Sequence, residues 1–291
     1  MKINIRELSK IYPNKNKALD NVSFEISDGL FGLLGPNGAG KSTLMRILVT
    51  LMKPTKGSVT IDGFDLQKNR KEIRGLLGYL PQDFSTFPKI KTWEFLDYSA
   101  RLAGLSNKKK RIQKIDLLLE KVGLFDSREK LASKLSGGMK RRVGIAQALI
   151  NDPKILIVDE PTTGLDPEER IRFRNLLTEM SRDERIIILS THIVGDISST
   201  CHDMALLSKG SLAFKGAPKD LIEQAVPYTY QLEVDYSELE KVKQEHIVIS
   251  TVPVDSGWQV DVVAKNINGF KARQIEPNLE HAYVCFMELL N

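Results

Sequence analysis

Apolar runs alternate with amphipathic stretches along the chain, and this alternation predicts the main fold class. Residues 155–158 and 186–189 are continuous runs of Ile, Leu and Val, typical of parallel strands buried on both faces. Residues 29–34 predict a third buried strand, which ends at a glycine-rich loop, and a helix is predicted from Lys41. The apolar face of this helix is predicted to contain Leu44, Ile47, Leu48 and Leu51. Strand and helix therefore alternate, as expected for an α/β protein with a parallel sheet.

The stretch between about residues 84 and 150 is predicted to be mostly helical. Its clearest apolar stripe at helical spacing is formed by Ile112, Ile115, Leu118, Leu119 and Val122. A second helix is predicted to start near Ser136. Further along, Asp166-Pro167-Glu168-Glu169 combines an N-cap residue, a proline at the first helical position and an acidic first turn. This combination predicts a helix between the two buried strands.

The chain changes character near Pro227, and we predict a domain boundary there. Residues 1–225 form the larger predicted domain, in which residues 3–8 and 22–26 alternate like half-buried strands. Residues 226–291 have the pattern of a small α+β domain and contain no constellation typical of catalysis. Its predicted elements are a strand at 228–234, a charged helix at 237–244, strands near 246–252 and 258–264, and a final helix from Asn278.

Composition and charge limit the kinds of protein that this chain can be. With 291 residues, of which 42% are hydrophobic and 27% charged, the sequence has ordinary globular composition. Its net charge of +5 is uneven, because residues 226–291 hold 5 basic and 10 acidic residues and residues 1–225 carry a net of +10. ATP, an anionic membrane surface and nucleic acid would all fit this charge, and so would a role in solubility alone.

The cysteines and the hydropathy pattern indicate the compartment. Cys201 and Cys285 are far apart and lack metal-ligand or CxxC spacing, so we expect structural thiols in a reducing compartment. No apolar run approaches the roughly 18 to 20 residues needed to cross a bilayer. The first eight residues alternate like a strand and lack the apolar core of a signal peptide. We therefore expect any membrane role to depend on another chain.

The glycine-rich loop at residues 35–42 reads Gly-Pro-Asn-Gly-Ala-Gly-Lys-Ser and fits the phosphate-binding pattern GxxxxGK[ST]. It lies between a predicted buried strand and a predicted helix, as the mechanism requires. Glycines let successive backbone N–H groups turn toward phosphate oxygens, and the helix N-terminus adds positive potential. Lys41 is expected to reach the β- and γ-phosphates, and the Ser42 hydroxyl is expected to bind Mg²⁺. The simpler alternative is a glycine-rich turn before an amphipathic helix.

Two adjacent carboxylates, Asp159 and Glu160, follow the predicted strand at residues 155–158. Ligand chemistry in α/β sheets gathers at the carboxyl ends of the strands, and paired carboxylates there call for cations. Asp159 is suited to hold Mg²⁺ through a water molecule, and Glu160 is suited to align or deprotonate the attacking water in phosphoryl transfer. Alone, the pair could also be an ordinary loop cap, but the upstream P-loop favours phosphoryl transfer.

A P-loop with an acidic strand end is equally typical of kinases, GTPases and ATPases, and residues 135–139, Leu-Ser-Gly-Gly-Met, discriminate among them. This segment resembles the LSGGQ signature of the ABC ATPase family, with Met139 in place of the glutamine. In that family, the serine hydroxyl and the glycine amides bind the γ-phosphate of ATP held by the opposite subunit. Ser136, Gly137 and Gly138 can supply this chemistry, because a capped helix start offers free N–H donors to an anion.

Four further positions fit the resemblance, which covers about residues 1–220. Tyr12 lies where the family places an aromatic ring on adenine, and Gln82 matches the glutamine that links the metal site to the helical subdomain. Residues 164–167 match the loop that crosses the dimer interface, where Asp166 is also a good N-cap. His192 matches the histidine that contacts the γ-phosphate. Taken singly, Tyr12 and His192 are also compatible with structural roles.

The resemblance implies a full assignment of site residues. The catalytic residues are Lys41, Glu160 and His192, and the Mg²⁺ site comprises Ser42, Gln82 and Asp159. The residues expected to bind nucleotide are Tyr12, Gly35, Pro36, Asn37, Gly38, Ala39, Gly40, Lys41, Ser42, Thr43, Gln82, Asp159, Ser136, Gly137, Gly138 and Asp166. The implied fold is a P-loop ABC ATPase core with an N-terminal antiparallel β subdomain and a helical signature subdomain, followed by the small C-terminal α+β domain.

The implied function is ATP binding and hydrolysis in a head-to-tail dimer that powers transport through separate membrane-spanning subunits. The expected cofactors are ATP and Mg²⁺, and the expected partners are those membrane subunits and a second ATP-binding subunit. The expected location is cytoplasmic, at the inner face of the cell membrane. Residues 275–283 resemble the Glu-Pro-x-Leu-Glu close of exporter ATPases, which favours export over import. The substrate stays open, because the translocation path belongs to the membrane subunits.

Two other functions are compatible with parts of the sequence. A soluble ABC protein acting on ribosomes or DNA is expected to carry two cassettes or a long coiled coil, whereas here there is one cassette in which Ser136 follows Lys41 at a separation of 95 residues. The basic run at residues 108–111 opens an amphipathic helix and is expected to be a solvated face, so nucleic acid is not an expected partner. A non-catalytic nucleotide-binding regulator is disfavoured by the presence of both Lys41 and Glu160.

Overall fold

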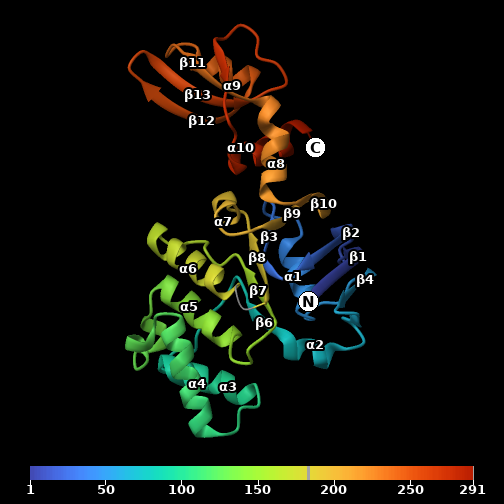
Figure 1. Cartoon of the computed structure of the whole chain (residues 1–291), viewed down its shortest axis with the longest axis vertical. Helices are drawn as coiled ribbons and strands as arrows, with labels where there is room; N and C mark the ends of the chain where they lie inside the picture. The colour runs from blue at the N-terminus through green and yellow to red at the C-terminus, as the bar shows by residue number, and fades with distance from the viewer. Residues whose placement is uncertain (182–183, 291) are drawn as a thin grey trace. The chain divides into compact units, whose positions relative to one another are not determined.

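The computed structural model describes residues 1–181 and 184–290, which divide into two compact units. Unit 1 comprises Met1–His192 and Ala205–Leu212, and unit 2 comprises Ile193–Met204 and Ala213–Asn291, of which the last residue lies outside the described part. Residues 213–225 pack with unit 2, whereas the sequence interpretation ended the larger domain at residue 225. Figure 1 shows the elements of both units.

The central strands of unit 1 belong to a six-stranded sheet with the order β10-β9-β3-β8-β7-β6, whose edge strand β10 continues into the residues of unit 2. Its strands are β3 Gly29–Leu34, β6 Leu77–Leu80, β7 Ile155–Asp159, β8 Ile186–Thr191, β9 Asp203–Ser208 and β10 Ser211–Gly216. The strands β3, β8, β7 and β6 are paired in parallel. Every residue of β7 and β8 is buried, which confirms the prediction from their continuous apolar runs.

A second, antiparallel sheet of unit 1 has the order β2-β1-β4-β5. Its strands are β1 Lys2–Ile11, β2 Lys17–Ser27, β4 Lys56–Ile61 and β5 Phe64–Asp65. Its inward side chains share one apolar core with β3 and with α1 (Lys41–Leu48), as the packing of Leu8, Leu19, Phe31 and Leu44 illustrates. This core joins the antiparallel subdomain to the strand and helix on either side of the glycine-rich loop.

Helix α1 ends earlier than the sequence predicted. Leu44, Ile47 and Leu48 are buried, as expected for its apolar face. Leu51, which we expected on the same face, is 67% exposed, so that part of the prediction was wrong. The reason is that Thr50 adopts φ of +62°, which turns the chain out of the helix before Leu51 is reached.

The remaining helices of unit 1 are α2 Arg70–Leu76, α3 Thr92–Leu102, α4 Lys108–Lys121, α5 Gly137–Ala148 and α6 Pro167–Met180, with 3-10 turns at Phe125–Ser127 and Ala132–Lys134. Helices α3, α4 and α5 lie together, away from the antiparallel sheet (Figure 1). The predicted stripe on α4 is buried except at Ile112, which is half-buried. The caps of α5 and α6 are Ser136 and Asp166, as predicted.

Unit 2 contains a four-stranded antiparallel sheet with the order β12-β13-β11-β14. Its elements are α7 Val194–Ser198, α8 Pro218–Ala225, a 3-10 turn at Val226–Tyr228, β11 Thr229–Val234, α9 Leu239–Glu245, β12 Ile247–Val254, β13 Gly257–Val263, β14 Ala272–Gln274, α10 Leu279–Cys285 and a π-helical turn at Phe286–Leu290. Val242 of α9 packs against Leu232, Val260 and Val262 of the sheet. The sequence predicted β11, α9, β12, β13 and α10, but not α7, β14 or the short turns.

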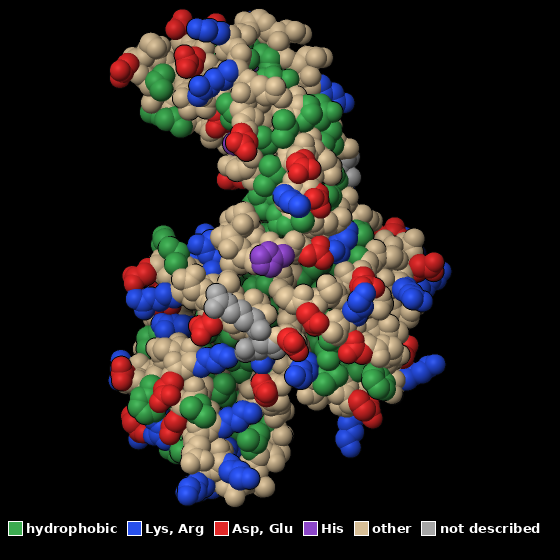
Figure 2. Space-filling model, viewed as in Figure 1, with side chains coloured by type: hydrophobic (Ala, Val, Ile, Leu, Met, Phe, Trp, Pro, Cys, Tyr) green, Lys and Arg blue, Asp and Glu red, His purple; other side chains and the backbone are tan. Residues whose placement is uncertain are grey.

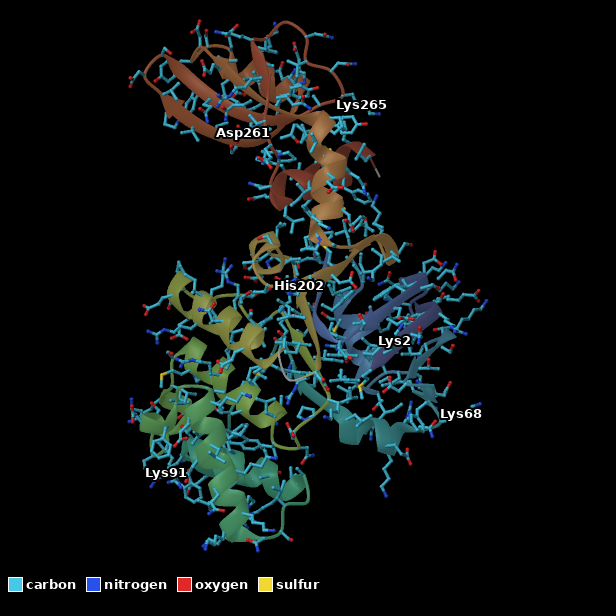
Figure 3. All side chains as sticks on the ribbon, viewed as in Figure 1. Lys2, Lys68, Lys91, His202, Asp261 and Lys265 are labelled. Carbon is cyan, nitrogen blue, oxygen red and sulfur yellow. The ribbon has the colours of Figure 1, made fainter. Side chains whose placement is uncertain are left out.

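The opposite side of this sheet carries a polar row that joins its four strands. Asp261 of β13 (Figure 3) accepts hydrogen bonds from Gln231 Nε2 at 2.7 Å and from Ser250 Oγ at 3.0 Å. Gln231 Oε1 accepts a hydrogen bond from Arg273 Nε at 3.0 Å. Side chains therefore reinforce the backbone pairing of this small sheet.

Charges of both signs are mixed on the surface, and the two thiols lie inside the protein. Lys and Arg side chains are scattered among Asp and Glu on the visible face of unit 1, without one dominant patch (Figure 2). Cys201 and Cys285 are both free and buried. Of the helices in the described part of the chain, none is long and apolar enough to cross a membrane.

Candidate active site

The glycine-rich loop connects β3 to α1, so the central sheet and a buried helix hold its two ends. Gly38 and Gly40 adopt φ of +82° and +103°, in the left-handed region that favours glycine. A Cβ atom on Gly40 would lie 2.4 Å from the carbonyl oxygen of Ala18. Glycine is therefore required at position 40 both by backbone conformation and by the close approach of β2.

The Lys41 side chain is folded back into this loop. It is 4% exposed, and its Nζ donates hydrogen bonds to the carbonyl oxygens of Gly35 at 2.7 Å and Pro36 at 3.1 Å. The same Nζ lies 3.3 Å from Oε1 of Glu160. The loop thus concentrates one positive charge beside the carboxylate at the end of β7.

Glu160 is buried and held from three sides. Besides its ion pair with Lys41, its Oε2 lies 2.6 Å from Nδ1 of His192 and accepts a hydrogen bond from Thr163 Oγ1 at 3.1 Å. Its backbone has φ of +48°, an uncommon conformation for a residue with a Cβ, and its N–H donates to the Ser190 carbonyl at 2.9 Å. Thr163 was missed by the sequence analysis, although a hydroxyl three residues after a carboxylate is a usable signal.

Asp159 is the last residue of β7 and is 2% exposed. Burial raises the pKa of its carboxyl above the ordinary value, and the Glu160 carboxylate adds to the rise, whereas the Ser42 hydroxyl and the Lys41 ammonium oppose it. Its Oδ1 is buried and has no hydrogen-bond partner among the described residues. A buried carboxylate oxygen without a donor fits a divalent cation, because hard cations prefer oxygen ligands.

A cavity of about 330 Å³ opens beside the loop. It brings together most of the predicted nucleotide-binding residues, and its lining consists of Tyr12, Asn16, Lys17, Ala18, Asn37, Gly38, Ala39, Gly40, Lys41, Ser42, Thr43, Gln82 and Glu160. The Tyr12 hydroxyl lies 3.2 Å from Oγ1 of Thr43, which ties the aromatic residue to the start of α1. Asn16, Lys17 and Ala18 were not predicted, because only the fold brings the start of β2 to the loop.

Gln82 lies in the loop after β6 and is exposed. Arg141 of α5 donates hydrogen bonds from Nη1 to the carbonyl oxygens of Pro81, at 3.2 Å, and of Gln82. The sequence analysis did not identify Arg141. Its contacts connect the Gln82 loop directly to the helix that begins with the Ser136 signature.

The signature residues lie at helix starts away from this cavity. Ser136 Oγ accepts a hydrogen bond from the backbone N–H of Met139 at 3.2 Å, and Asp166 Oδ1 accepts one from the N–H of Glu169 at 2.8 Å. Ser136, Gly137 and Asp166 are exposed, whereas Gly138 is buried. Because the cap uses only the backbone of Met139, the change from glutamine does not disturb it.

Comparisons with known proteins show which family the chain belongs to. The family model described as "ABC transporter" matches residues 19–163. The protein named "Uncharacterized ABC transporter ATP-binding protein YxlF" of Bacillus subtilis is 37% identical over 237 residues, which cover 80% of this chain and 76% of that protein. The chain belongs to the ABC transporter ATP-binding family. The members of this family are ATPases, so the chain is an ATPase. It is the ATP-binding subunit of an ABC transporter.

Other relatives of this ABC protein carry names of both transport directions. The "Nod factor export ATP-binding protein I" of Burkholderia pseudomallei is 36% identical, covering 77% of this chain and 73% of the relative. The "Methionine import ATP-binding protein MetN" of Vibrio vulnificus is 39% identical, covering 74% and 64%. A dimeric bacterial ABC transporter cassette, MJ0796, is a structural neighbour with a TM-score of 0.67, 26% identity and coverage of 74% of this chain and 98% of that cassette.

Proposed function

We propose that this ABC subunit hydrolyses ATP at two composite sites of a head-to-tail dimer and thereby powers export through separate membrane-spanning subunits. The observation that carries the proposal is the position of Glu160. It is a buried carboxylate at the edge of the phosphate-loop cavity, held by His192 and Thr163 and paired with Lys41. This is the place from which a carboxylate can orient the attacking water.

Lys41 and Glu160 are proposed to change partners when ATP binds. The γ-phosphate offers the Lys41 ammonium stronger acceptors than the loop carbonyls and draws it away from Glu160. Glu160 then keeps its contacts to His192 and Thr163, with one oxygen available to a water molecule. His192 fixes the direction of the carboxylate, and the Lys41 charge compensates the phosphate oxygens.

The residues beside the loop also fit a magnesium ion. Ser42, Gln82 and Asp159 would hold it, because the buried Asp159 Oδ1 lacks a hydrogen-bond donor among the described residues. When bound, Mg²⁺ supplies charge compensation for the β- and γ-phosphates. Asp159 and Ser42 would hold the ion beside the nucleotide phosphates, and Gln82 would connect the ion to the exposed loop after β6.

The proposed dimer places Ser136, Gly137, Gly138 and Asp166 against the ATP of the opposite subunit. Three of these four residues are exposed in the described chain, and they do not line its own phosphate cavity. Capped helix starts offer N–H groups to an anion, so a second copy is the natural source of the phosphate. The dimeric cassette among the structural neighbours supports this choice.

A groove of about 490 Å³ in unit 1 is proposed to receive a helix of the membrane-spanning partner. It lies between the loop after β6, helix α3 and the end of α5. The ring centroids of Phe87 and Tyr98 lie 5.6 Å apart. Phe87 is 52% exposed, Tyr98 49% and Leu102 72%. Exposed aromatic residues around a groove are typical anchors for a partner helix. The protein would then act at the cytoplasmic side of the membrane through this partner.

The direction of transport is proposed to be export. The relatives carry names of both directions, whereas residues 275–283 resemble the close of exporter subunits and support export. In the structure, Asn278 of this segment caps α10 by accepting hydrogen bonds from the N–H groups of Glu280 and His281. The segment therefore also has a local role in forming the last helix.

The composite site is tested by mixing two defective chains, Lys41→Ala and Ser136→Arg. A mixed dimer contains one site with both defects and one intact site, so ATPase activity should return to about a quarter of wild type after random mixing. Each variant alone should be nearly inactive. If the two variants form mixed dimers and mixing still restores no activity, the composite-site proposal is wrong.

A further inference from the structure

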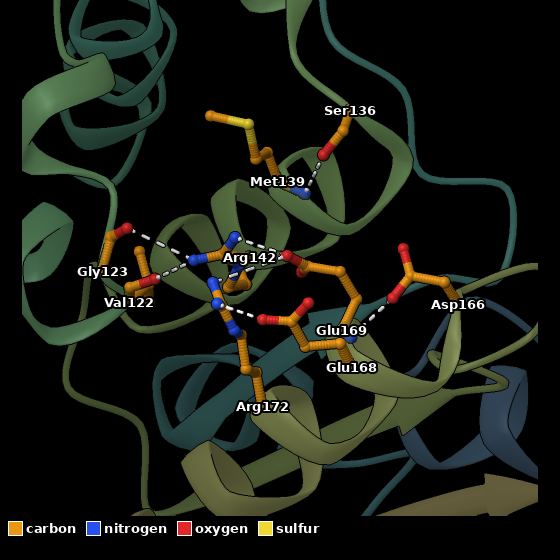
Figure 4. Close-up of polar contacts among 9 residues, drawn as sticks. All are labelled: Val122, Gly123, Ser136, Met139, Arg142, Asp166, Glu168, Glu169 and Arg172. Atoms are coloured by element: carbon orange, nitrogen blue, oxygen red, sulfur yellow. Dashed lines mark hydrogen bonds and ion pairs between the residues drawn. The ribbon is translucent and has the colours of Figure 1, made fainter.

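Arg142 of α5 joins three helices of unit 1 through one guanidinium group. Its Nη2 donates to Oε1 of Glu169 on α6 at 3.1 Å, as Figure 4 shows. Its Nη1 donates to the carbonyl oxygens of Val122 and Gly123, each at 3.2 Å, just after the end of α4. The side chains of Arg142 and Glu169 are only 11% and 18% exposed. A largely buried ion pair is costly to break from one side, so these helices are held in a fixed relation.

The signature glycines pack directly against residues at the start of α6. Gly138 and Arg142 are one helical turn apart on the same face of α5. A Cβ atom on Gly138 would lie 2.3 Å from Oε2 and 2.8 Å from Cγ of Glu169, so the glutamate crosses the bare backbone of this glycine to reach Arg142. On Gly137, a Cβ atom would lie 4.0 Å from Cδ2 of Leu165. Glycine at position 138 therefore leaves the space that the Glu169 side chain occupies on its way to Arg142.

Glu169 also takes part in the cap of its own helix through its backbone. Its backbone N–H donates to Asp166 Oδ1, while its side chain reaches α5. On the other helix, the N-cap residue Ser136 lies six residues before Arg142. The ion pair thus connects two exposed helix caps, Ser136 and Asp166, that come from segments 30 residues apart in the sequence.

We propose that Arg142 and Glu169 are positioning residues that hold the Ser136–Gly138 signature and the Gly164–Asp166 loop as one rigid surface for the ATP of the opposite subunit. This inference rests on the proposed composite site. Neither residue lines the phosphate cavity of its own chain. Their loss should therefore leave nucleotide binding by the monomer intact and weaken the step in which the second subunit closes on that nucleotide.

The first test replaces Glu169 by Gln, which keeps the size of the side chain and the contacts of Arg142 to the α4 carbonyls. We expect kcat to fall roughly ten- to hundred-fold, because a signature misplaced by about an ångström loses its alignment with the phosphate. Affinity of the monomer for a fluorescent ATP analogue should stay within about twofold of wild type. In a Glu160→Gln background, ATP-dependent dimerisation should need about tenfold more protein by analytical ultracentrifugation.

Arg172→Met is the matched control. Arg172 of α6 lies 2.5 Å from Glu168 and 3.9 Å from Glu169, so its loss removes a positive charge beside the same carboxylates without cutting a contact to α5. Its activity and dimerisation should remain at wild-type level. Arg142→Met is the second variant, and the Arg142→Met/Glu169→Gln double variant should lose no more activity than the worse single one, because both remove one link. Equal losses in Arg172→Met and Glu169→Gln would overturn the inference.

The decisive experiment asks in which subunit the pair acts. Glu169→Gln chains are mixed with Lys41→Ala chains, so that each mixed dimer has one site with both defects and one intact site. Activity should return to about a quarter of wild type, as in the Lys41→Ala and Ser136→Arg mixture. If that reference mixture recovers activity and the Glu169→Gln mixture does not, Glu169 acts on its own subunit and this inference fails alone. If neither mixture recovers, the composite site itself fails.

Discussion

Lys41 and Glu160 form an ion pair of 3.3 Å in which both side chains are almost completely buried. The pair connects the phosphate loop to the end of β7, so the two halves of the site compensate each other's charge before nucleotide binds. A charge left alone in such a place is costly, and each partner therefore stabilises the other in the buried state. On the proposed function, ATP would replace this internal pair by contacts between Lys41 and the nucleotide phosphates.

Lys41→Ala should weaken nucleotide binding. Charge-assisted hydrogen bonds contribute roughly 1.5–3 kcal/mol, so we expect about a ten- to hundred-fold loss of ATP affinity. Isothermal titration calorimetry with a slowly hydrolysed ATP analogue measures this loss. Lys2→Ala is the control, because Lys2 lies on β1, is mostly exposed and pairs with Glu25. Unchanged affinity in Lys41→Ala would remove Lys41 from the phosphate site.

Glu160→Gln should separate binding from hydrolysis. The amide keeps the shape of the side chain but lacks the charge and basicity that act on water, so kcat should fall by on the order of a hundredfold or more. ATP affinity should be preserved, and size-exclusion chromatography with ATP and Mg²⁺ should show an accumulated dimer. Glu168→Gln, at an exposed carboxylate of α6, is the control. A monomer with normal turnover would exclude the assigned role of Glu160.

Asp159→Asn should stabilise the nucleotide-free protein while abolishing its response to Mg²⁺. Because the pKa of Asp159 in the folded state is raised from 3.8, folding favours the protonated form. Stability is therefore lost as the pH rises from the pKa of the unfolded state through the pKa of the folded state. Above that window the ionised wild-type carboxyl destabilises the fold, and asparagine removes this penalty. Thermal melts at neutral pH should show a higher Tm for Asp159→Asn without nucleotide, and a smaller gain on adding ATP and Mg²⁺. A lower Tm without nucleotide contradicts this account of the buried carboxyl.

Phe87→Ala should uncouple the subunit from its membrane partner without damaging its own site. The Phe87 ring is 52% exposed and lines the groove beside α3. Its centroid lies 5.9 Å from that of the Phe95 ring. We expect normal folding and basal ATPase activity in the isolated subunit, with weaker co-purification with the membrane subunits and reduced transport. Phe125→Ala removes another exposed ring outside the groove and serves as the control. Wild-type recovery of the partner by Phe87→Ala would move the docking surface elsewhere.

Much of the fold could be predicted from the sequence because local pattern and global position agree. The runs at residues 155–158 and 186–189 are apolar at every position, and both strands are buried throughout. The glycine-rich loop carries its own context, a strand before it and a helix after it. The end of α1 was misjudged because apolar spacing continues to Leu51, whereas the backbone of Thr50 leaves the helix.

Other parts of the site depend on contacts that no local pattern contains. Arg142 and Glu169 are 27 residues apart, and each has the ordinary appearance of a charged residue on an amphipathic helix. Only the packing of α5 on α6 shows that the glutamate fills the space left by Gly138. The approach of Ala18 to Gly40 is of the same kind, because β2 and the phosphate loop are neighbours in space alone.

The two buried thiols make the chain convenient for site-specific labelling. Burial raises the pKa of Cys201 to about 12 and also raises that of Cys285, so both sulfurs are shielded from solvent and poorly ionised at neutral pH. A single cysteine introduced at an exposed position outside the groove, such as Leu117, would therefore react with maleimide dyes far faster than either native thiol. The native protein should therefore give little background labelling in fluorescence or spin-label distance measurements on the transporter.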